Sequence, residues 1–278
     1  MEIVKHQGLN ILILILSGIT VAFIVFPLAS ILTFAEPTKL FDSLTRPELW
    51  DALVLSLISA TISTLFLALF GIPLAYFLAR YTNFRGKFII RVAVIIPLVL
   101  PPLASGALLL GVFGPNSSLT QYFPRVEFTQ SMLGIIIAQT YVASPFMVLA
   151  SQAAFESVDK SYEMVARSLG KSKLETFFRI SLPLAKTGII IGVIMSWVRA
   201  AGELGATMMM AYNPHTISIQ IFEDNAIGGL RQAVSGIILV VLLAILIIIV
   251  LYIINNKGLR VISLGKSNSN GHNYYLRE

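Results

Sequence analysis

The sequence predicts an all-α integral membrane protein with six transmembrane helices. Of its 278 residues, 56% are hydrophobic and only 12% are charged, and the mean hydropathy is +0.83. A soluble domain carries about 25% charged residues. A helix needs roughly 20 consecutive apolar residues to cross about 30 Å of hydrocarbon. Nothing resembles ten-residue alternating strands, so the spans are expected to be helices.

Six stretches are long and apolar enough to span a membrane: about 9–34, 52–79, 88–113, 132–153, 187–211 and 233–254. The first is too long for a signal-peptide core, and no small-residue cleavage site follows it, so we expect a retained helix. Residues 1–50 then hold the first helix and an outer loop, and 51–254 a transmembrane core with a polar loop at about 154–186. The polar tail 255–278 is rich in Gly, Asn and Ser, and we expect it to be disordered.

The basic residues predict the orientation of the chain. With six spans the loops alternate between the two sides, and fifteen of the twenty Lys and Arg residues fall on the side of the termini and of the 154–186 loop. The positive-inside rule places that side in the cytoplasm of a cell-membrane protein. A nucleic-acid-binding surface is the weaker interpretation, because these charges are not interleaved with aromatic residues.

No motif for catalysis is complete in the sequence. Two GKS tripeptides, at 170–172 and 265–267, lack the earlier glycine of a phosphate-binding loop, since Val165 and Arg260 stand at that position. There is no cysteine, and the three histidines are scattered, which disfavours thiol chemistry and a metal site. We therefore expect a chain that is not an enzyme and carries no cofactor or metal.

Two ionisable residues lie in the fifth apolar stretch. Arg199 and Glu203 are four residues apart, so they share a helical face and could pair. Such residues cost several kcal/mol unless paired or hydrated, and they often mark a translocation pathway. A pore-lining pair and a structural ion pair are both open from the sequence. Small residues around them, including Gly205, favour close helix packing, and Thr207 follows as a further pathway candidate.

Three prolines interrupt the third apolar stretch: Pro97, Pro101 and Pro102. Each removes a backbone donor, so the freed carbonyls must be satisfied by neighbours or by a wet cavity. The prolines predict a kink, which either shapes a pore or only serves packing.

The polar loop contains a predicted amphipathic helix. The residues at i, i+3, i+4 and i+7 that share its apolar face are Tyr162, Val165, Ala166 and Leu169. Glu163 and Arg167 fall largely elsewhere, and Gly170 allows a sharp turn. A second helix is predicted from about Lys173 to Pro183. Taken alone, this periodicity favours a helix lying on its own membrane domain or on headgroups.

The spacing Gly170, nine residues, Ile180-x-Leu182-Pro183 resembles the EAA loop of binding-protein-dependent ABC importers. The family's Glu-Ala-Ala positions hold Met164, Val165 and Ala166 in this chain, with the acid one residue earlier at Glu163.

The resemblance extends over roughly 50–255. The segments GIPLAYFLAR, IPLVLPPLASG, AQTYVASPFMVLASQAAFESVD and RAAGELGATMMMAYNP are similar to the permease subunit of molybdate, tungstate and sulfate importers. The segment AYNPHTISIQIFEDNAIGGL resembles archaeal-type molybdate/tungstate permeases. Sulfate or thiosulfate remains an alternative substrate, and an ATP-independent secondary carrier is the alternative of a different class.

The resemblance implies a type I ABC importer permease fold and an assembly. Two copies of the permease form the pore, two ATP-binding cassette subunits hydrolyse ATP with Mg²⁺ beneath it, and an extracytoplasmic protein delivers the oxyanion. Each ATPase is expected to bind a coupling helix in the loop, formed by Tyr162, Glu163, Val165, Ala166, Leu169 and Gly170.

Overall fold

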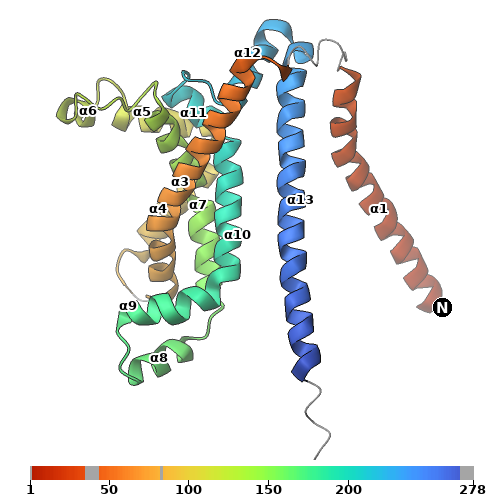
Figure 1. Ribbon diagram of the computed structural model, residues 1–278, viewed down its shortest axis with the longest axis vertical. Coiled ribbons are helices and arrows are strands. Elements are labelled where there is room, and N and C mark those ends of the chain that lie inside the picture. Colours follow the sequence, from red (N-terminus) through yellow and green to blue (C-terminus); the bar gives the residue numbers. More distant parts are fainter. Residues whose placement is uncertain (1, 35–43, 82–83, 270–278) are drawn as a thin grey trace, which may run out of the picture. The chain divides into compact units, whose positions relative to one another are not determined.

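A computed structural model of the chain describes residues 2–34, 44–81 and 84–269, and every regular element in them is a helix (Figure 1). The chain divides into two compact units. The core unit comprises residues 47–222, and the terminal unit comprises 1–46 together with 223–278.

The core unit holds most of the helices, which are α3 (Pro47–Arg80), α4 (Lys87–Val99), α5 (Pro102–Phe113), α6 (Ser118–Tyr122), α7 (Met132–Glu156), α8 (Lys160–Ser168), α9 (Lys173–Thr176), the π-helical turn η2 (Phe177–Ser181), α10 (Leu182–Ala201) and α11 (Gly205–Met210). Helix α12 (Ile217–Gly228) runs across the boundary between the units. The terminal unit holds α1 (Glu2–Ser30), η1 (Ile31–Thr33) and α13 (Leu230–Ser269).

Helix α7 is the centre of the core unit, where it packs against both α3 and α10. Small residues set the α7–α10 spacing: a Cβ added to Gly188 would come within 2.5 Å of the Ala154 Cβ. Such residues let helix backbones approach closely in a membrane. Polar contacts also join the spans, as where the Ser63 hydroxyl of α3 donates to Gln139 Oε1 of α7 at 3.2 Å.

Among the described residues, five helices are long and apolar enough to cross a membrane. They match the first, second, fourth, fifth and sixth expected spans: Ile11–Ser30, Pro47–Arg80, Met132–Glu156, Lys173–Ala201 and Leu230–Ile249. The third expected span, 88–113, is divided into α4 and α5, which are 13 and 12 residues long. The helix stops at Leu100 and Pro101, which are extended, and restarts with Pro102 at its first position. A proline there lacks only a backbone donor that would be unpaired anyway. Pro97 lies inside α4 without ending it.

The fifth span also differs from the expected continuous helix over 187–211. It begins earlier, since α9, η2 and α10 follow one another from Lys173, and it ends at Ala201. Three residues then separate α10 from the short α11. Gly202 has a poor helix propensity, and the Glu203 carboxylate accepts the Ala206 N–H, which starts a new helix. The expectation of one unbroken helix through Glu203 is therefore wrong.

Helix α13 continues to Ser269, whereas the sequence suggests a disordered tail from about residue 255. Extending an existing helix costs far less than nucleating one, which favours this continuation. The last part of the expected tail, 270–278, lies outside the described residues.

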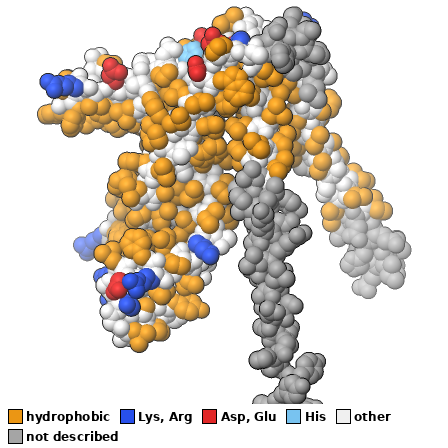
Figure 2. Space-filling view, in the orientation of Figure 1, with side chains coloured by type: hydrophobic (Ala, Val, Ile, Leu, Met, Phe, Trp, Pro, Cys, Tyr) orange, Lys and Arg blue, Asp and Glu red, His pale blue; other side chains and the backbone are white. Residues whose placement is uncertain are grey.

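The surface of the core unit agrees with a membrane protein. Figure 2 shows hydrophobic side chains over most of the visible face of its long helices, with Lys, Arg, Asp and Glu gathered at the α8 end and at the α6 end. Exposed apolar residues recur along α3, including Ile58, Leu65 and Leu69. A soluble protein rarely exposes such a wide apolar surface to water, so we expect lipid or another subunit to cover it.

Candidate functional site

Helix α8 is short but well defined at both ends. Asp159 caps its N-terminus by accepting the Ser161 backbone N–H at 2.8 Å, and this hydrogen bond holds the pKa of Asp159 below its usual range. At the other end Gly170 has a φ of +86°, and its N–H donates to the Arg167 carbonyl. The Lys171 N–H reaches back to the Ala166 carbonyl at 3.1 Å, which completes a Schellman turn. The predicted glycine turn is confirmed.

Helix α8 presents an apolar face outward. Tyr162, Val165 and Leu169 are 58%, 58% and 78% exposed, although all three are large hydrophobic residues. We call these three residues the exposed face of α8. Ala166, which the sequence placed on the same face, is 7% exposed and turns toward the rest of the unit. The expected four-residue face is thus a three-residue face, because α8 lies against η2.

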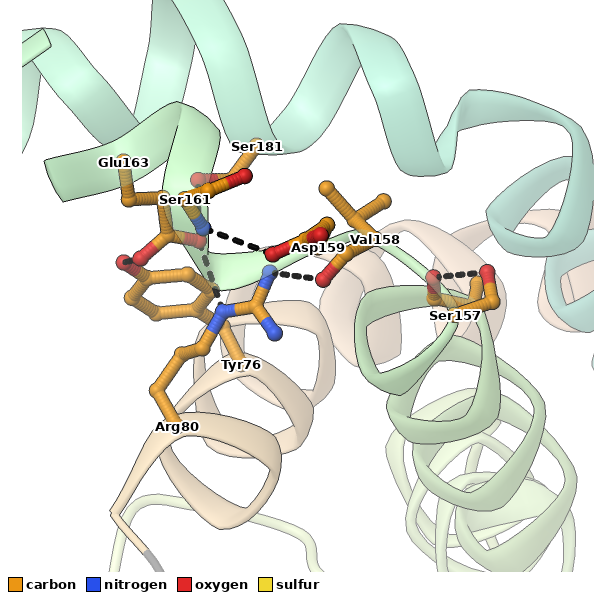
Figure 3. A network of polar contacts seen from close by, with 9 residues as sticks. Tyr76, Arg80, Ser157, Val158, Asp159, Ser161, Glu163 and Ser181 are labelled. Atoms are coloured by element: carbon orange, nitrogen blue, oxygen red, sulfur yellow. Dashed lines mark hydrogen bonds and ion pairs between the residues drawn. The ribbon is translucent and has the colours of Figure 1, made fainter. Parts of the chain in front are cut away.

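Glu163 points the other way, into a network of polar contacts (Figure 3). Its Oε1 pairs with Arg80 Nε at 2.6 Å and accepts the Ser181 hydroxyl at 2.7 Å, while its Oε2 accepts the Tyr76 hydroxyl at 3.1 Å. Arg80 Nη2 also donates to the Val158 carbonyl at 3.1 Å. The Arg80 and Glu163 side chains are only 7% and 14% exposed.

These contacts attach α8 to the end of α3 and to η2, which leads into α10. The carboxylate of Glu163 is engaged in these contacts and does not belong to the exposed face, although the sequence places Glu163 in the predicted docking set. Sequence reasoning missed Arg80 and Tyr76, which stand four residues apart at the end of a span. Nothing local marks their partner, because Glu163 is 83 residues away from Arg80.

A second group of residues lies where the two interrupted spans meet. A cavity of about 480 Å³ is bordered by the α4–α5 break and by the α10–α11 break, and we call it the break cavity. Its lining residues include Pro101, Pro102, Arg199, Glu203, Gly205 and Met208. The two breaks touch closely, since a Cβ on Gly205 would come within 2.8 Å of the Pro102 Cβ. The expected close packing of small residues is confirmed here.

Arg199 and Glu203 form the ion pair that their spacing predicts, between Nη1 and Oε2. They do so across the helix break: Arg199 is in the last turn of α10, and Glu203 precedes α11. A cation at a helix C-terminus and an acid at a helix N-terminus both complement the helix dipole. Glu203 is 1% exposed, whereas the Arg199 side chain is 27% exposed and lines the cavity.

The structure sorts the seven pathway candidates into two groups. Pro101, Pro102, Arg199, Glu203 and Gly205 border the break cavity. Pro97 and Thr207 are buried and are absent from its lining.

Comparisons with known proteins agree with this architecture. The family described as "Binding-protein-dependent transport system inner membrane component" matches residues 71–260. A probable molybdenum ABC transporter permease protein of Haloferax volcanii is 43% identical over 222 residues, which are 80% of this chain and 81% of that protein. A molybdate/tungstate transport system permease protein of Pyrococcus furiosus is 39% identical over 221 residues, 78% of this chain and 83% of that one.

Among solved structures, a bacterial ABC transporter involved in the import of the polysaccharide alginate shares the fold with a TM-score of 0.63 and 16% sequence identity. The match covers 90% of this chain and 96% of that one.

Proposed function

Because the chain belongs to the family of inner-membrane components of binding-protein-dependent transport systems, we propose that it is the permease subunit of an ATP-driven importer of molybdate or tungstate. The substrate proposal is supported by the relatives at 43% and 39% identity, whose names refer to molybdenum and to molybdate/tungstate. This chain forms the translocation pathway, and a separate subunit hydrolyses ATP.

The exposed face of α8 is the observation that carries this proposal. Three large apolar side chains stand outward on a helix whose opposite side is attached to two spans through Glu163. An exposed apolar patch rimmed by polar residues is typical of a protein interaction site. An ATP-independent carrier has no need of such a face, whereas a permease needs one that receives the motion of its ATPase.

The proposed assembly follows from this face and from the family. Two copies of the chain line the pore, each α8 binds one ATPase subunit, and an extracytoplasmic protein delivers the anion. The α8 end then lies in the cytoplasm together with both termini, as the basic residues of the sequence predict.

Docking is tested by copurification. Tyr162, Val165 and Leu169 are replaced together by Ser, and an ATPase subunit coexpressed with the chain is quantified after affinity purification of the permease. We expect the ATPase to be lost from the triple variant. The control variant replaces Tyr122 and Phe123, which are exposed near α6, by Ser and should retain the partner. Equal retention of the ATPase by both variants would refute the docking role of α8.

The break cavity is the proposed passage for the anion. A dianion cannot cross about 30 Å of hydrocarbon unless its path is wet or lined by donors. Arg199 offers such donors from the wall of the cavity. Its ion pair with Glu203 keeps the affinity for the anion low, so that the anion is released again.

The substrate class is tested by reconstitution with binding protein and ATPase. Uptake of molybdate, tungstate and sulfate is measured in the same vesicles, with and without ATP. We expect ATP-dependent uptake of molybdate or tungstate. Uptake of sulfate alone would identify the chain as a sulfate permease of the same family. If none of the three anions is taken up, the proposal of an oxyanion importer is refuted.

A further inference from the structure

A smaller cavity lies on another side of α8. It is a half-open cavity of about 300 Å³, and its lining includes Tyr76 and Arg80 of α3, Lys160, Glu163 and Arg167 of α8, and Lys173 of α9. We call it the α8 cavity. Residues 160, 164 and 167 recur at i, i+4 and i+7, so they share one helix face. That face is not the one formed by Tyr162, Val165 and Leu169, so a partner bound to the exposed face does not account for these cations.

The α8 cavity is strongly cationic. Four of its lining side chains are basic, namely Arg80, Lys160, Arg167 and Lys173, and one is a carboxylate. That carboxylate, Glu163, is already compensated by Arg80, Tyr76 and Ser181. Lys160, Arg167 and Lys173 form no ion pair with any residue of the described part of the chain. A concave site lined by one sign of charge concentrates ions of the opposite sign.

Arg80 gives a second, independent indication of a ligand. Its side chain is 7% exposed, and its Nε and Nη2 donate to Glu163 and to the Val158 carbonyl. Its Nη1 has no hydrogen bond to any described residue, although Arg80 lines the cavity. A guanidinium carries five N–H donors, and Nη1 is not fully buried, so it can donate into the cavity. An acceptor atom that enters the cavity would give Nη1 of Arg80 a hydrogen-bond partner.

We propose that the α8 cavity binds a tetrahedral oxyanion of the phosphate class. The donors come from α3, α8 and α9 and surround the cavity, which fits an anion with oxygens in several directions better than a planar carboxylate. Arginine forks match phosphate oxygens, and lysines add point charges. The volume equals about ten water molecules at about 30 Å³ each, enough for a hydrated oxyanion.

Two sources can supply this chemistry. Helix α3, which is long and apolar enough to span a membrane, ends at Arg80, so the phosphate of an anionic lipid headgroup is one source. Free phosphate in solution is the other source. In either case the bound anion bridges α8, α3 and α9 and stabilises the position of α8, independently of what the importer carries.

The test uses the full-length chain without partners, so its outcome does not depend on the proposed transport function. The pocket variant replaces Lys160, Arg167 and Lys173 by Gln. The control variant replaces Lys171, Arg179 and Lys186 by Gln, which are nearby basic residues in the sequence that do not line the cavity. Both variants lose the same formal charge, and all six side chains are exposed, so folding should survive. Circular dichroism and size-exclusion chromatography confirm that it does.

Two binding measurements distinguish the sources. Delipidated protein in neutral detergent is titrated with inorganic phosphate at constant ionic strength and followed by its melting temperature. In parallel, native mass spectrometry counts phosphatidylglycerol retained from mixed vesicles with phosphatidylcholine. We expect the parent chain and the control variant to bind in at least one assay, and the pocket variant to bind at least tenfold more weakly there. Phosphate-dependent stabilisation assigns a free anion, and retained phosphatidylglycerol assigns a headgroup. Absence of binding in both assays, or equal loss in both variants, would overturn the proposal.

Discussion

At the scale of single residues, Arg199 is the side chain on which the proposed anion passage depends most directly. It lines the break cavity, whereas its partner Glu203 is 1% exposed. Removing Arg199 alone leaves a buried carboxylate without its cation, which is destabilising in itself. A variant that separates transport from stability must therefore change both residues.

We predict that Arg199→Ala lowers oxyanion uptake at least tenfold and also lowers stability. The double variant Arg199→Ala/Glu203→Gln should regain stability but not uptake, because the buried charge is gone while the donor is still missing. Arg199→Lys should recover part of the uptake, since the charge remains and the fork is lost. Uptake in reconstituted vesicles and melting temperature are the measurements. If the double variant regains uptake as well, the pair is structural.

Arg80 and Glu163 form the second residue-scale pair, and here stability is the expected readout. Glu163→Leu leaves a guanidinium 7% exposed and unpaired, which should cost about 3 kcal/mol or more. Adding Arg80→Met should restore much of that loss, because the uncompensated charge is removed. Denaturant unfolding of the detergent-solubilised chain measures both.

The matched control for this pair is Glu156→Leu. Its ion pair with Arg91 is 3.8 Å long, with side chains 46% and 48% exposed. Such pairs contribute about 1 kcal/mol or less. Equal losses for Glu163→Leu and Glu156→Leu would contradict the structural weight given to Arg80 and Glu163.

At the scale of elements, the turn after α8 sets the direction in which its exposed face points. Gly170 has a φ of +86°, and a Cβ there would meet no atom within 4 Å. A side chain at position 170 is therefore disfavoured by the backbone conformation alone. The left-handed conformation costs a residue with a Cβ about 1–2 kcal/mol. Asparagine enters this region more readily than alanine.

We predict that Gly170→Ala lowers the amount of oxyanion transported per ATP hydrolysed, because the end of α8 is displaced. Gly170→Asn should have a smaller effect. Gly111→Ala is the control, since Gly111 is helical and also has open space for a Cβ. Coupled uptake and ATP hydrolysis are measured in the same vesicles. Unchanged coupling in Gly170→Ala would show that the turn does not orient α8.

The elements differ in how far sequence could predict them. Five spans follow from apolar length, which is a sum over neighbouring residues. The turn at Gly170 follows from a single residue type. The break after Ala201 does not, because it depends on where the Glu203 carboxylate finds its donor. The inward side of α8 was missed for a similar reason, since Glu163 is fixed by Arg80 and Tyr76 from a distant span.

At the scale of the whole molecule, orientation in the membrane is the property open to direct test. Residues near α6 precede α7, and residues near α8 follow it, so the two groups lie at opposite ends of one span. The sequence contains no cysteine, which makes labelling of single introduced cysteines unambiguous.

We predict that cysteines at Gln121 and Arg125 react with an impermeant thiol reagent in intact cells. Cysteines at Arg85 and Lys171 should react only after the cells are lysed, because the positive-inside rule predicts that the basic α8 end faces the cytoplasm. All four positions are exposed, so access through the protein itself does not limit labelling. The reverse pattern would invert the topology and refute ATPase docking on α8.

The sides of α8 also bear on how importers of this kind diversify. Tyr162, Val165 and Leu169 face outward, whereas Glu163 and Ala166 fasten the helix to the rest of the chain. Substitutions in the first group leave the contacts of the second group intact, so the proposed ATPase-binding face can change without loss of the contacts that hold α8 in place. Helix α8 and its C-terminal residue Leu169 thus carry two separate sets of side chains, and only the exposed set is free to vary with the proposed partner.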